Sequence, residues 1–194
     1  MHLAPVTLAG RHVRLEPLRA EHAARLLPVA LDPALWEWTT TQVRTAAELD
    51  AYVEEALRGE AAGTALPFAT IDVASGRAVG STRFANASPV DRRVEIGWSW
   101  VARDFQRTAV NTEAKLLMLE HAFGALGCLR VEFKADALNA ASRAAIARLG
   151  AREEGTLRRH TVTSTGRVRD TVYYSILREE WPGVRDALLA RLAR

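Results

Sequence analysis

The chain lacks the features of several specialised protein classes. Its 194 residues include a single cysteine, Cys128, which cannot form an internal disulfide and has no neighbours at metal-ligand spacing. No apolar run approaches the ~20 residues of a membrane span, and the first residues contain no apolar segment long enough for a signal peptide. We therefore expect a cytoplasmic protein with no metal site and no membrane contact, and with Cys128 in the core.

The chain also has little excess charge and almost no lysine. Its 26 Lys and Arg residues oppose 23 Asp and Glu residues, and only Lys115 and Lys134 are lysines. The arginines are scattered, so we expect no nucleic-acid partner. The segment 152–169 is an exception, with five arginines and His160 against two glutamates. One hypothesis is that this segment forms a surface that binds a substrate. The other is that it belongs to a nucleic-acid-binding module, which a steep salt dependence of binding would support.

What the chain does have is the length and the 48% apolar content of one domain, here residues 1–194. Apolar periodicity predicts helices in 19–31, 45–59, 112–126, 139–150 and from about 182 onward. Alternation and turn residues predict strands in 11–18, 66–86 (two strands joined at Ser75 and Gly76), 92–102, 128–136, 155–162 and 170–177. An early meander that leads into one strand-helix-strand unit predicts an α+β fold with a mixed, mostly antiparallel sheet of six to seven strands flanked by helices.

Polar and small residues fill the stretch 104–115, "DFQRTAVNTEAK", where a strand gives way to a helix. The first N–H groups of a helix lack intrahelical partners and carry partial positive charge, so such a loop can hold a phosphate, with Arg107 as an additional cation. The alternative is an ordinary polar loop that is capped by Thr108 or Asn111.

This loop and the following "TEAKLLMLEHAFGALGCLRVEFKADALNAASRAAIARLGAREEGTLRRH" resemble the coenzyme-A-binding core of the GNAT superfamily of N-acetyltransferases, in particular its ribosomal-protein-alanine-acetyltransferase-like branch. The resemblance extends over nearly the whole chain and implies acetyl-coenzyme A as cofactor. The implied cofactor-binding residues are Trp100, Val101, Gln106, Arg107, Thr108, Ala109, Val110, Asn111, Thr112, Asn139 and Ser142.

Two residues of the loop depart from the family's Q/R-x-x-G-x-G/A motif. Ala109 stands where the family has glycine, and Asn111 stands where it has glycine or alanine. An alanine is tolerated there if the residue is already helical, because a helical residue does not need positive φ. These two departures from the motif concern the affinity for the cofactor.

The strand "RRVEIGWSWVA" supplies a candidate base. Strict alternation places Val94, Ile96, Trp98 and Trp100 on one face and Glu95, Gly97 and Ser99 on the other. Glu95 resembles the strand glutamate that is often the general base in the family. The alternative is that Glu95 forms an ion pair with an arginine such as Arg83.

The family's usual acid, a tyrosine, is missing from 139–150, and Ile146 lies near the expected position. Ser142 is the remaining hydroxyl, either an acid for the coenzyme sulfur or an ordinary first-turn serine, and Asn139 is an N-cap and a pantetheine contact. The candidate acceptor-binding residues are Trp36, Trp38, Arg83, His160 and Asp170. Trp36 and Trp38 can equally be buried between helices, and His160 and Asp170 can be solvated strand residues.

The sequence thus predicts an enzyme, an N-acetyltransferase that moves the acetyl group of acetyl-coenzyme A to a primary amine by direct attack on the thioester. The acceptor is a peptide or protein N-terminus or a small amine. The rival hypothesis is a degenerate acyl-coenzyme-A-binding protein without turnover. The acceptor's identity and the oligomeric state, a homodimer included, are left open.

Overall fold

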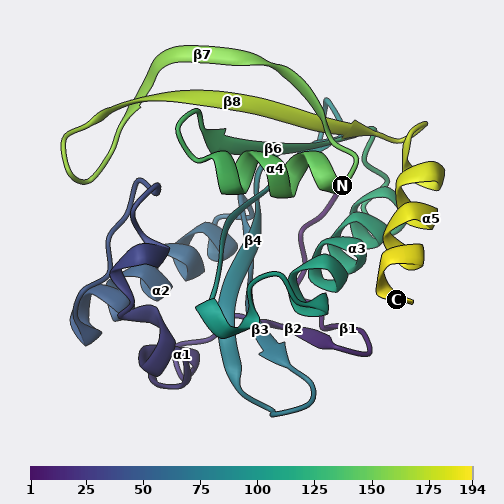
Figure 1. Ribbon diagram of the computed structural model, residues 1–194. Coiled ribbons are helices and arrows are strands. Elements are labelled where there is room, and N and C mark those ends of the chain that lie inside the picture. Colours follow the sequence, from purple (N-terminus) through teal and green to yellow (C-terminus); the bar gives the residue numbers. More distant parts are fainter. Residues whose placement is uncertain (194) are drawn as a thin grey trace.

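The computed structural model describes residues 1–193, in which an eight-stranded sheet is covered on both faces by five α-helices (Figure 1). The strands are β1 Leu8–Ala9, β2 Val13–Pro17, β3 Leu66–Asp72, β4 Ala78–Ser88, β5 Arg93–Val101, β6 Arg130–Asp136, β7 Arg152–Val162 and β8 Val168–Leu177. The α-helices are α1 His22–Ala30, α2 Ala46–Ala61, α3 Ala109–Phe123, α4 Ala140–Arg148 and α5 Trp181–Leu192. Two short 3₁₀ turns, Pro33–Leu35 and Arg103–Phe105, are also present in this range.

The strand order is β1-β2-β3-β4-β5-β6-β8-β7. Every neighbouring pair is antiparallel except β5 and β6, which are joined by α3 and run parallel. The predicted α+β fold with a mixed, mostly antiparallel sheet is therefore confirmed. The sheet has one strand more than the upper expectation because the two-residue β1, too short to show alternation, pairs with β2.

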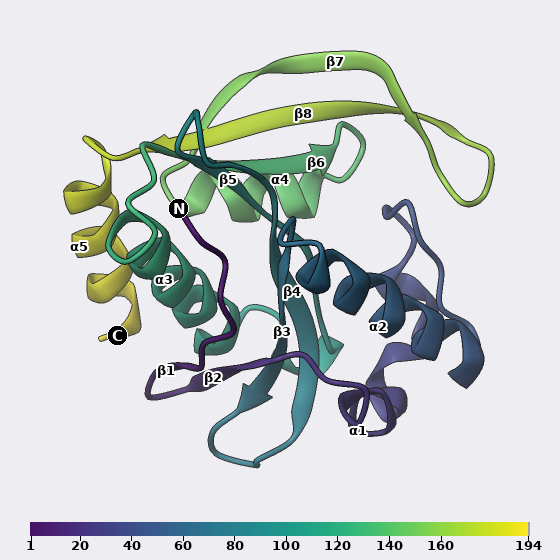
Figure 2. The same cartoon turned by 180° about the vertical axis from the view of Figure 1, so that it is seen from behind.

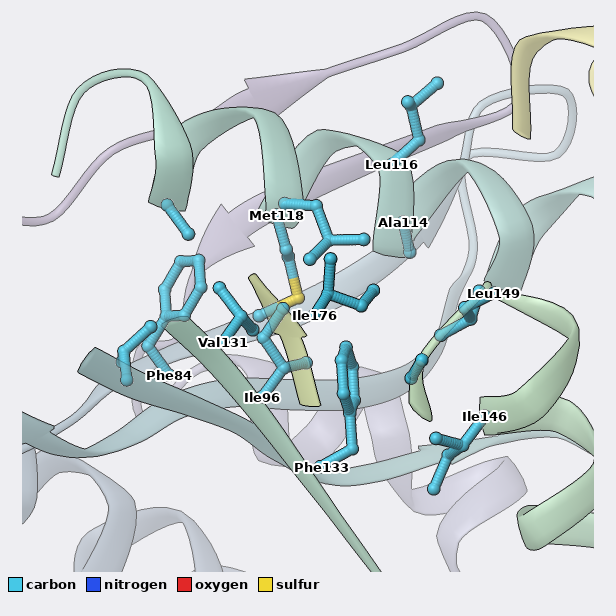
Figure 3. Packing of buried hydrophobic residues seen from close by; sticks show 14 of the residues in the cluster. Phe84, Ile96, Ala114, Leu116, Met118, Val131, Phe133, Ile146, Leu149 and Ile176 are labelled. Carbon is cyan, nitrogen blue, oxygen red and sulfur yellow. The ribbon is translucent and has the colours of Figure 1, made fainter. Parts of the chain in front are cut away.

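Two apolar cores lie on opposite faces of this sheet (Figure 2). The first core packs α3, α4 and α5 against one face, and Figure 3 shows Ile96, Phe84, Met118 and Ile176 within it. The second core packs α1 and α2 against the other face. The sheet is therefore buried on both sides near its centre, where every residue of β3 is buried.

Glu113 fixes the position of α3. Its carboxylate accepts hydrogen bonds from the backbone N–H groups of Arg11, His12 and Val13 at 2.9, 2.6 and 2.8 Å. These N–H groups belong to the turn after β1 and to the first residue of β2, so one buried side chain ties the helix to the start of the sheet.

A bulge in β5 contradicts the strict alternation that the sequence predicts. Arg83 of β4 pairs with Gly97, but Ser81, two residues earlier, pairs with Trp100, three residues later. The extra residue on β5 reverses the orientation of the residues after it, and Trp98 adopts a φ of 48°. The prediction that Val94, Ile96, Trp98 and Trp100 share one face is therefore wrong.

The side chains beside the bulge separate accordingly. Val94 and Ile96 lie in the first core, Trp100 lies in the second core, and Trp98 is 37% exposed. Glu95 and Gly97 do share the α1/α2 face, but Ser99 lies on the α3 face, where it meets Lys115.

The parallel strands β5 and β6 are paired only at their beginnings. Arg93, Val94 and Glu95 pair with Arg130, Val131 and Glu132, and beyond these residues the two strands follow different partners. β5 continues along β4, whereas β6 continues along β8. The strands therefore part just after Glu95.

Candidate functional site

The loop before α3 presents backbone donors without partners. Arg107 has a φ of 61°, and Thr108 is the N-cap, its hydroxyl accepting from the N–H of Val110 at 3.3 Å. Within residues 1–193, the N–H groups of Arg107, Thr108 and Ala109 make no hydrogen bond. Consecutive free N–H groups at a helix N-terminus are suited to a phosphate oxygen.

The structure of this loop shows the conformation of Ala109 and which residue caps α3. Ala109 is the first residue of α3, so its β-carbon lies in an ordinary helical conformation and glycine is not required. The cap is Thr108, and Asn111 lies in the first turn of the helix. Gln106 folds back, its Nε2 donating to the carbonyl of Val101 at 3.2 Å.

Trp100 differs from the other residues expected to bind the cofactor. Its side chain is buried in the second core, and its Nε1 donates to the hydroxyl of Tyr52 at 3.2 Å. Tyr52 and Trp36 pack against its ring at centroid distances of 6.4 and 5.3 Å. The indole therefore stabilises the core, and only the backbone of Trp100 is available to a ligand.

The start of α4 is as the sequence predicts. Oδ1 of Asn139 accepts from the N–H of Ser142 at 2.9 Å, which makes Asn139 the N-cap. Ser142 is half-buried, and its hydroxyl makes no hydrogen bond within the described chain. Ile146, near the position where a tyrosine acid was expected, is buried in the first core.

Glu95 lies where β5 and β6 part, with only 5% of its side chain exposed. Its Oε2 is 2.7 Å from Nζ of Lys134 and accepts from Nδ2 of Asn86 at 2.7 Å. Arg83, the partner considered from sequence, is not the one found. A β-carbon at Gly97 would lie 2.9 Å from Oε1 of Glu95, so the glycine makes room for the carboxylate.

A chain of contacts runs from Glu95 to the outer strand. Nζ of Lys134 lies 4.8 Å from the ring centre of Tyr173, and the ring of His160 meets Tyr173 edge-on at 5.7 Å. Burial opposes the charge of Lys134, but the hydrogen bond and Coulomb attraction to Glu95, with Tyr173, raise the pKa of Lys134 above its ordinary value. His160 thus belongs to the same face as Glu95.

The other lysine lies on the α3 face. Nζ of Lys115 donates to Oγ of Ser99 at 2.6 Å and to Oγ1 of Thr82 at 3.0 Å. Burial without a carboxylate partner lowers the pKa of Lys115 to about 7. Sequence reasoning assigned no role to Lys115 or Lys134, and the only signal was that they are the two lysines of an arginine-rich chain.

The remaining acceptor-side candidates divide into two groups. Trp36 is buried, its Nε1 donating to the carbonyl of Ala30 at 2.7 Å, and Asp170 accepts from the N–H of Arg159 at 2.6 Å at a bulge of β7. Both are therefore held by local structure. Trp38 is half-buried, and the guanidinium of Arg167 lies 5.6 Å from its ring centre.

Arg83 lies near the bulge on the α1/α2 face. Its guanidinium lies over the rings of Tyr52 and Trp98, 5.0 and 5.2 Å from their centres. Beyond it, an open depression of about 700 Å³ is lined by Thr64, Asn86, Ala87, Ser88, Arg93, Glu132, Lys134 and Tyr173. The depression thus reaches Asn86 and Lys134, the two residues that contact Oε2 of Glu95.

Several arginines of the segment 152–169 are already paired. Arg167 and Arg169 both approach the buried carboxylate of Asp136, and Arg152 lies 2.9 Å from Glu180. Across residues 1–193, no cluster of three or more His, Cys, Asp or Glu side chains is arranged to hold a metal ion. The helices in this range are too short or too polar to span a membrane.

Comparison with known proteins places this geometry in a family. Residues 12–152 match the model of the acetyltransferase (GNAT) domain. YdaF of Bacillus subtilis (strain 168), whose provisional name is ribosomal N-acetyltransferase, is 36% identical over 108 residues, which are 56% of this chain and 58% of YdaF. The chain therefore spans less than two thirds of that curated relative.

Solved structures resemble the chain over almost its whole length. A GCN5-related N-acetyltransferase from Brucella melitensis superimposes on the chain with a TM-score of 0.90 and is 33% identical in sequence. The match covers 97% of this chain and 86% of the Brucella chain. RimJ of Mycobacterium smegmatis, solved in complex with CoA-disulfide, superimposes on the chain with a TM-score of 0.84 and is 28% identical in sequence. The match covers 98% of this chain and 97% of the RimJ chain.

Proposed function

The chain belongs to the GNAT acetyltransferase family, and from this premise we propose that it transfers the acetyl group of acetyl-coenzyme A to a primary amine. One observation carries the proposal. The free N–H groups before α3 and the carboxylate of Glu95 lie at opposite ends of one segment, 95–109, which begins where β5 leaves β6. The proposed phosphate site and the proposed base are thereby joined by the rest of β5 and the short loop that follows it.

The residues around this segment fit coenzyme A. The N–H groups of Arg107, Thr108 and Ala109 would bind its phosphates, with the guanidinium of Arg107 as a further cation, and Asn139 and Ser142 would contact the pantetheine. When bound, acetyl-coenzyme A supplies the thioester that the amine attacks. RimJ, a structural relative, was solved with a coenzyme A derivative, which supports this assignment.

Glu95 is the proposed base. At neutral pH an acceptor amine is mostly in its protonated ammonium form, and it must lose a proton before it can attack the thioester. Oε2 of Glu95 is engaged by Lys134 and Asn86, which leaves Oε1 to receive that proton directly or through one water. The contacts of Lys134 and Asn86 hold the carboxylate in position, and the free hydroxyl of Ser142 is the proposed proton donor to the departing sulfur.

The acceptor is proposed to be a peptide or protein N-terminus, with small amines as the other candidates. YdaF has a ribosomal N-acetyltransferase name, and a structure from Vibrio cholerae, 17% identical, has a provisional ribosomal-protein-serine acetyltransferase name. The names belong to those proteins, and the second likeness supports only the fold. Acceptor surfaces are assembled from variable loops, so the acceptor needs its own test.

A thiol-release assay tests the proposal. Acetyl-coenzyme A is incubated with the protein and, separately, with peptides, polyamines, amino acids and aminoglycosides, and release of coenzyme A with at least one amine is expected. Coenzyme A should also stabilise the native state, by about 2.7 kcal/mol at a hundredfold excess over Kd. Stabilisation without turnover across the panel would instead support the acyl-coenzyme-A-binding protein, and the absence of both stabilisation and turnover would contradict both hypotheses.

A further inference from the structure

Arg83 shares its face of the sheet with Glu95. Phe84 and Ile96 are paired across β4 and β5, and both lie in the core beneath α3. Alternation therefore places Arg83 and its partner Gly97 on the opposite face, together with the next pair, Ala85 and Glu95. A cation and a carboxylate thus flank Gly97 on neighbouring strands.

These two charges do not neutralise each other. The carboxylate of Glu95 is paired with Lys134, whereas Nε and Nη2 of Arg83 are buried and have no hydrogen-bond partner among residues 1–193. Arg83 is only 4% exposed. A buried guanidinium normally satisfies its N–H groups, because an unpaired polar group in the interior is costly.

Aromatic contacts explain the position of Arg83 but leave its N–H groups unsatisfied. Tyr52 and Trp98 lie over the guanidinium, and the hydroxyl of Tyr52 donates to the carbonyl of Trp98 at 3.4 Å, which links the two residues. These cation–π contacts supply no lone-pair acceptor to the N–H groups of Arg83, which point outward in the plane of the guanidinium. The plane is the direction from which a carboxylate binds with two parallel hydrogen bonds.

We propose that Arg83 binds a carboxylate of the acceptor, so that the preferred acceptor is an amine with a carboxylate close to it. The ammonium then lies at Oε1 of Glu95 and the carboxylate at Arg83, on either side of Gly97. A free amino acid offers this arrangement through its α-carboxylate, and a peptide offers it through an acidic first side chain. This inference rests on the proposed acetyl transfer and names the chemistry of its acceptor.

Trp98 covers part of the proposed subsite, since its ring meets the guanidinium of Arg83. Nε and Nη2 of Arg83 have no exposed surface, so binding of the carboxylate requires a neighbouring side chain to move. Of the two aromatic residues at the guanidinium, Trp98 is 37% exposed and Tyr52 is 3% exposed, which makes Trp98 the residue that moves in this proposal.

Two pairs of acceptors test the proposal, each a carboxylate and its amide, with kcat/KM expressed per concentration of unprotonated amine because an α-carboxylate raises the pKa of the neighbouring amine. Alanine is compared with alaninamide, and a peptide that begins with Asp is compared with the same peptide beginning with Asn. A charge-assisted pair of hydrogen bonds favours the acid over its amide by about 10- to 100-fold in kcat/KM in at least one pair. The pair that shows the preference identifies the source of the carboxylate.

The variants Arg83→Met and Arg83→Lys assign the preference to this residue. Arg83→Met should make acid and amide equivalent, chiefly by raising KM for the acid, and Arg83→Lys should restore part of the preference because it keeps the charge. Arg185→Met is the matched control, since Arg185 pairs with Glu120 on an exposed surface, and it should keep the full preference. Circular dichroism and melting temperature confirm that each variant is folded.

The outcomes separate this inference from the proposed function. Acetylation of acid and amide at equal rates by the wild-type protein, or an unchanged preference in folded Arg83→Met, overturns the role of Arg83 and leaves acetyl transfer standing. Absence of turnover with every amine overturns the proposed function itself. If Arg83→Met does not fold, an unchanged acid preference in Arg83→Lys overturns a bidentate guanidinium contact, and a reduced preference supports it.

Discussion

The two lysines of the chain lie on opposite faces of the same sheet, and burial acts on them in opposite ways. Lys134 meets the carboxylate of Glu95, and its pKa is raised. Within the described part of the chain, Lys115 meets the hydroxyls of Thr82 and Ser99 and no carboxylate, and its pKa is lowered to about 7. Burial disfavours the charged form at both sites, and the presence of a carboxylate decides the direction.

The difference separates the two faces by function. The α1/α2 face keeps polar charged groups next to an open depression, as an amine acceptor needs. The α3 face is covered by a helix, and its lysine is 6% exposed beside Thr82, whose hydroxyl also meets the sulfur of Met118 in the first core. The same residue type thus belongs to a proposed reaction site on one face and to the packed interior on the other.

The largest expected effect comes from removing the carboxylate that distinguishes the two faces. Glu95→Gln keeps the size and the hydrogen bonding of the side chain but removes its basicity. We expect kcat/KM to fall about 10²-fold, with little change in coenzyme A affinity and partial recovery at high pH, where more of the amine is already deprotonated. Steady-state kinetics from about pH 6 to about pH 9 measure both.

Glu132→Gln is the control for this variant. Glu132 lies on the same face of the neighbouring strand and is held by Arg130 and Arg93, so it tests the loss of a carboxylate that is not the proposed base. It should keep most of the activity. A Glu95→Gln protein with normal rates but a lower melting temperature would make Glu95 a structural ion-pair partner.

Local features of the site could be predicted from sequence because neighbouring residues determine them. Asn139 caps α4, and the polar stretch before α3 forms the turn with free N–H groups, both through contacts within a few residues. The strand-helix-strand order likewise predicted the parallel pair of β5 and β6. These predictions depend on backbone chemistry that a short sequence contains.

The partners across strands could not be predicted in this way. The bulge at Trp98 depends on how β4 and β5 align, and it reverses the orientation of every later residue of β5. Glu95 finds Lys134, and Lys115 finds Thr82, only because β6, β4 and α3 meet in space. Alternation alone assigned Trp100 to the wrong face, since it contains no signal for an inserted residue.

The second prediction removes the cation on the proposed reaction face. Lys134→Met leaves the buried carboxylate of Glu95 without its cation and with Asn86 as its remaining hydrogen-bond donor, so the carboxylate is held less firmly in place. We expect kcat/KM at pH 7 to fall about tenfold, with little change in coenzyme A affinity. Lys134→Arg keeps the positive charge and should retain most of the activity. An unchanged kcat/KM in folded Lys134→Met would show that Lys134 does not act through Glu95.

The smallest expected effect comes from the other lysine and has the opposite sign. Lys115→Met replaces a buried cation with an apolar side chain of similar length, and Thr82 and Ser99 still share a hydrogen bond at 2.6 Å. Because the pKa of Lys115 is lowered from 10.5 to about 7, the unfolded wild-type chain binds a proton that the folded chain has released between these values. The free energy of unfolding of the wild type therefore rises with pH across this window, and the full cost of the buried charge is present below pH 7.

Because of this pH dependence, the difference in stability between Lys115→Met and the wild type should itself change with pH. We expect the variant to be more stable than the wild type by about 1 kcal/mol at pH 6, with the difference shrinking toward pH 10 as the wild type gains stability. Denaturant unfolding at several pH values measures this, with Leu117→Met on the same helix as the control without a titratable group. A difference independent of pH would show that another property of Lys115 sets the stability.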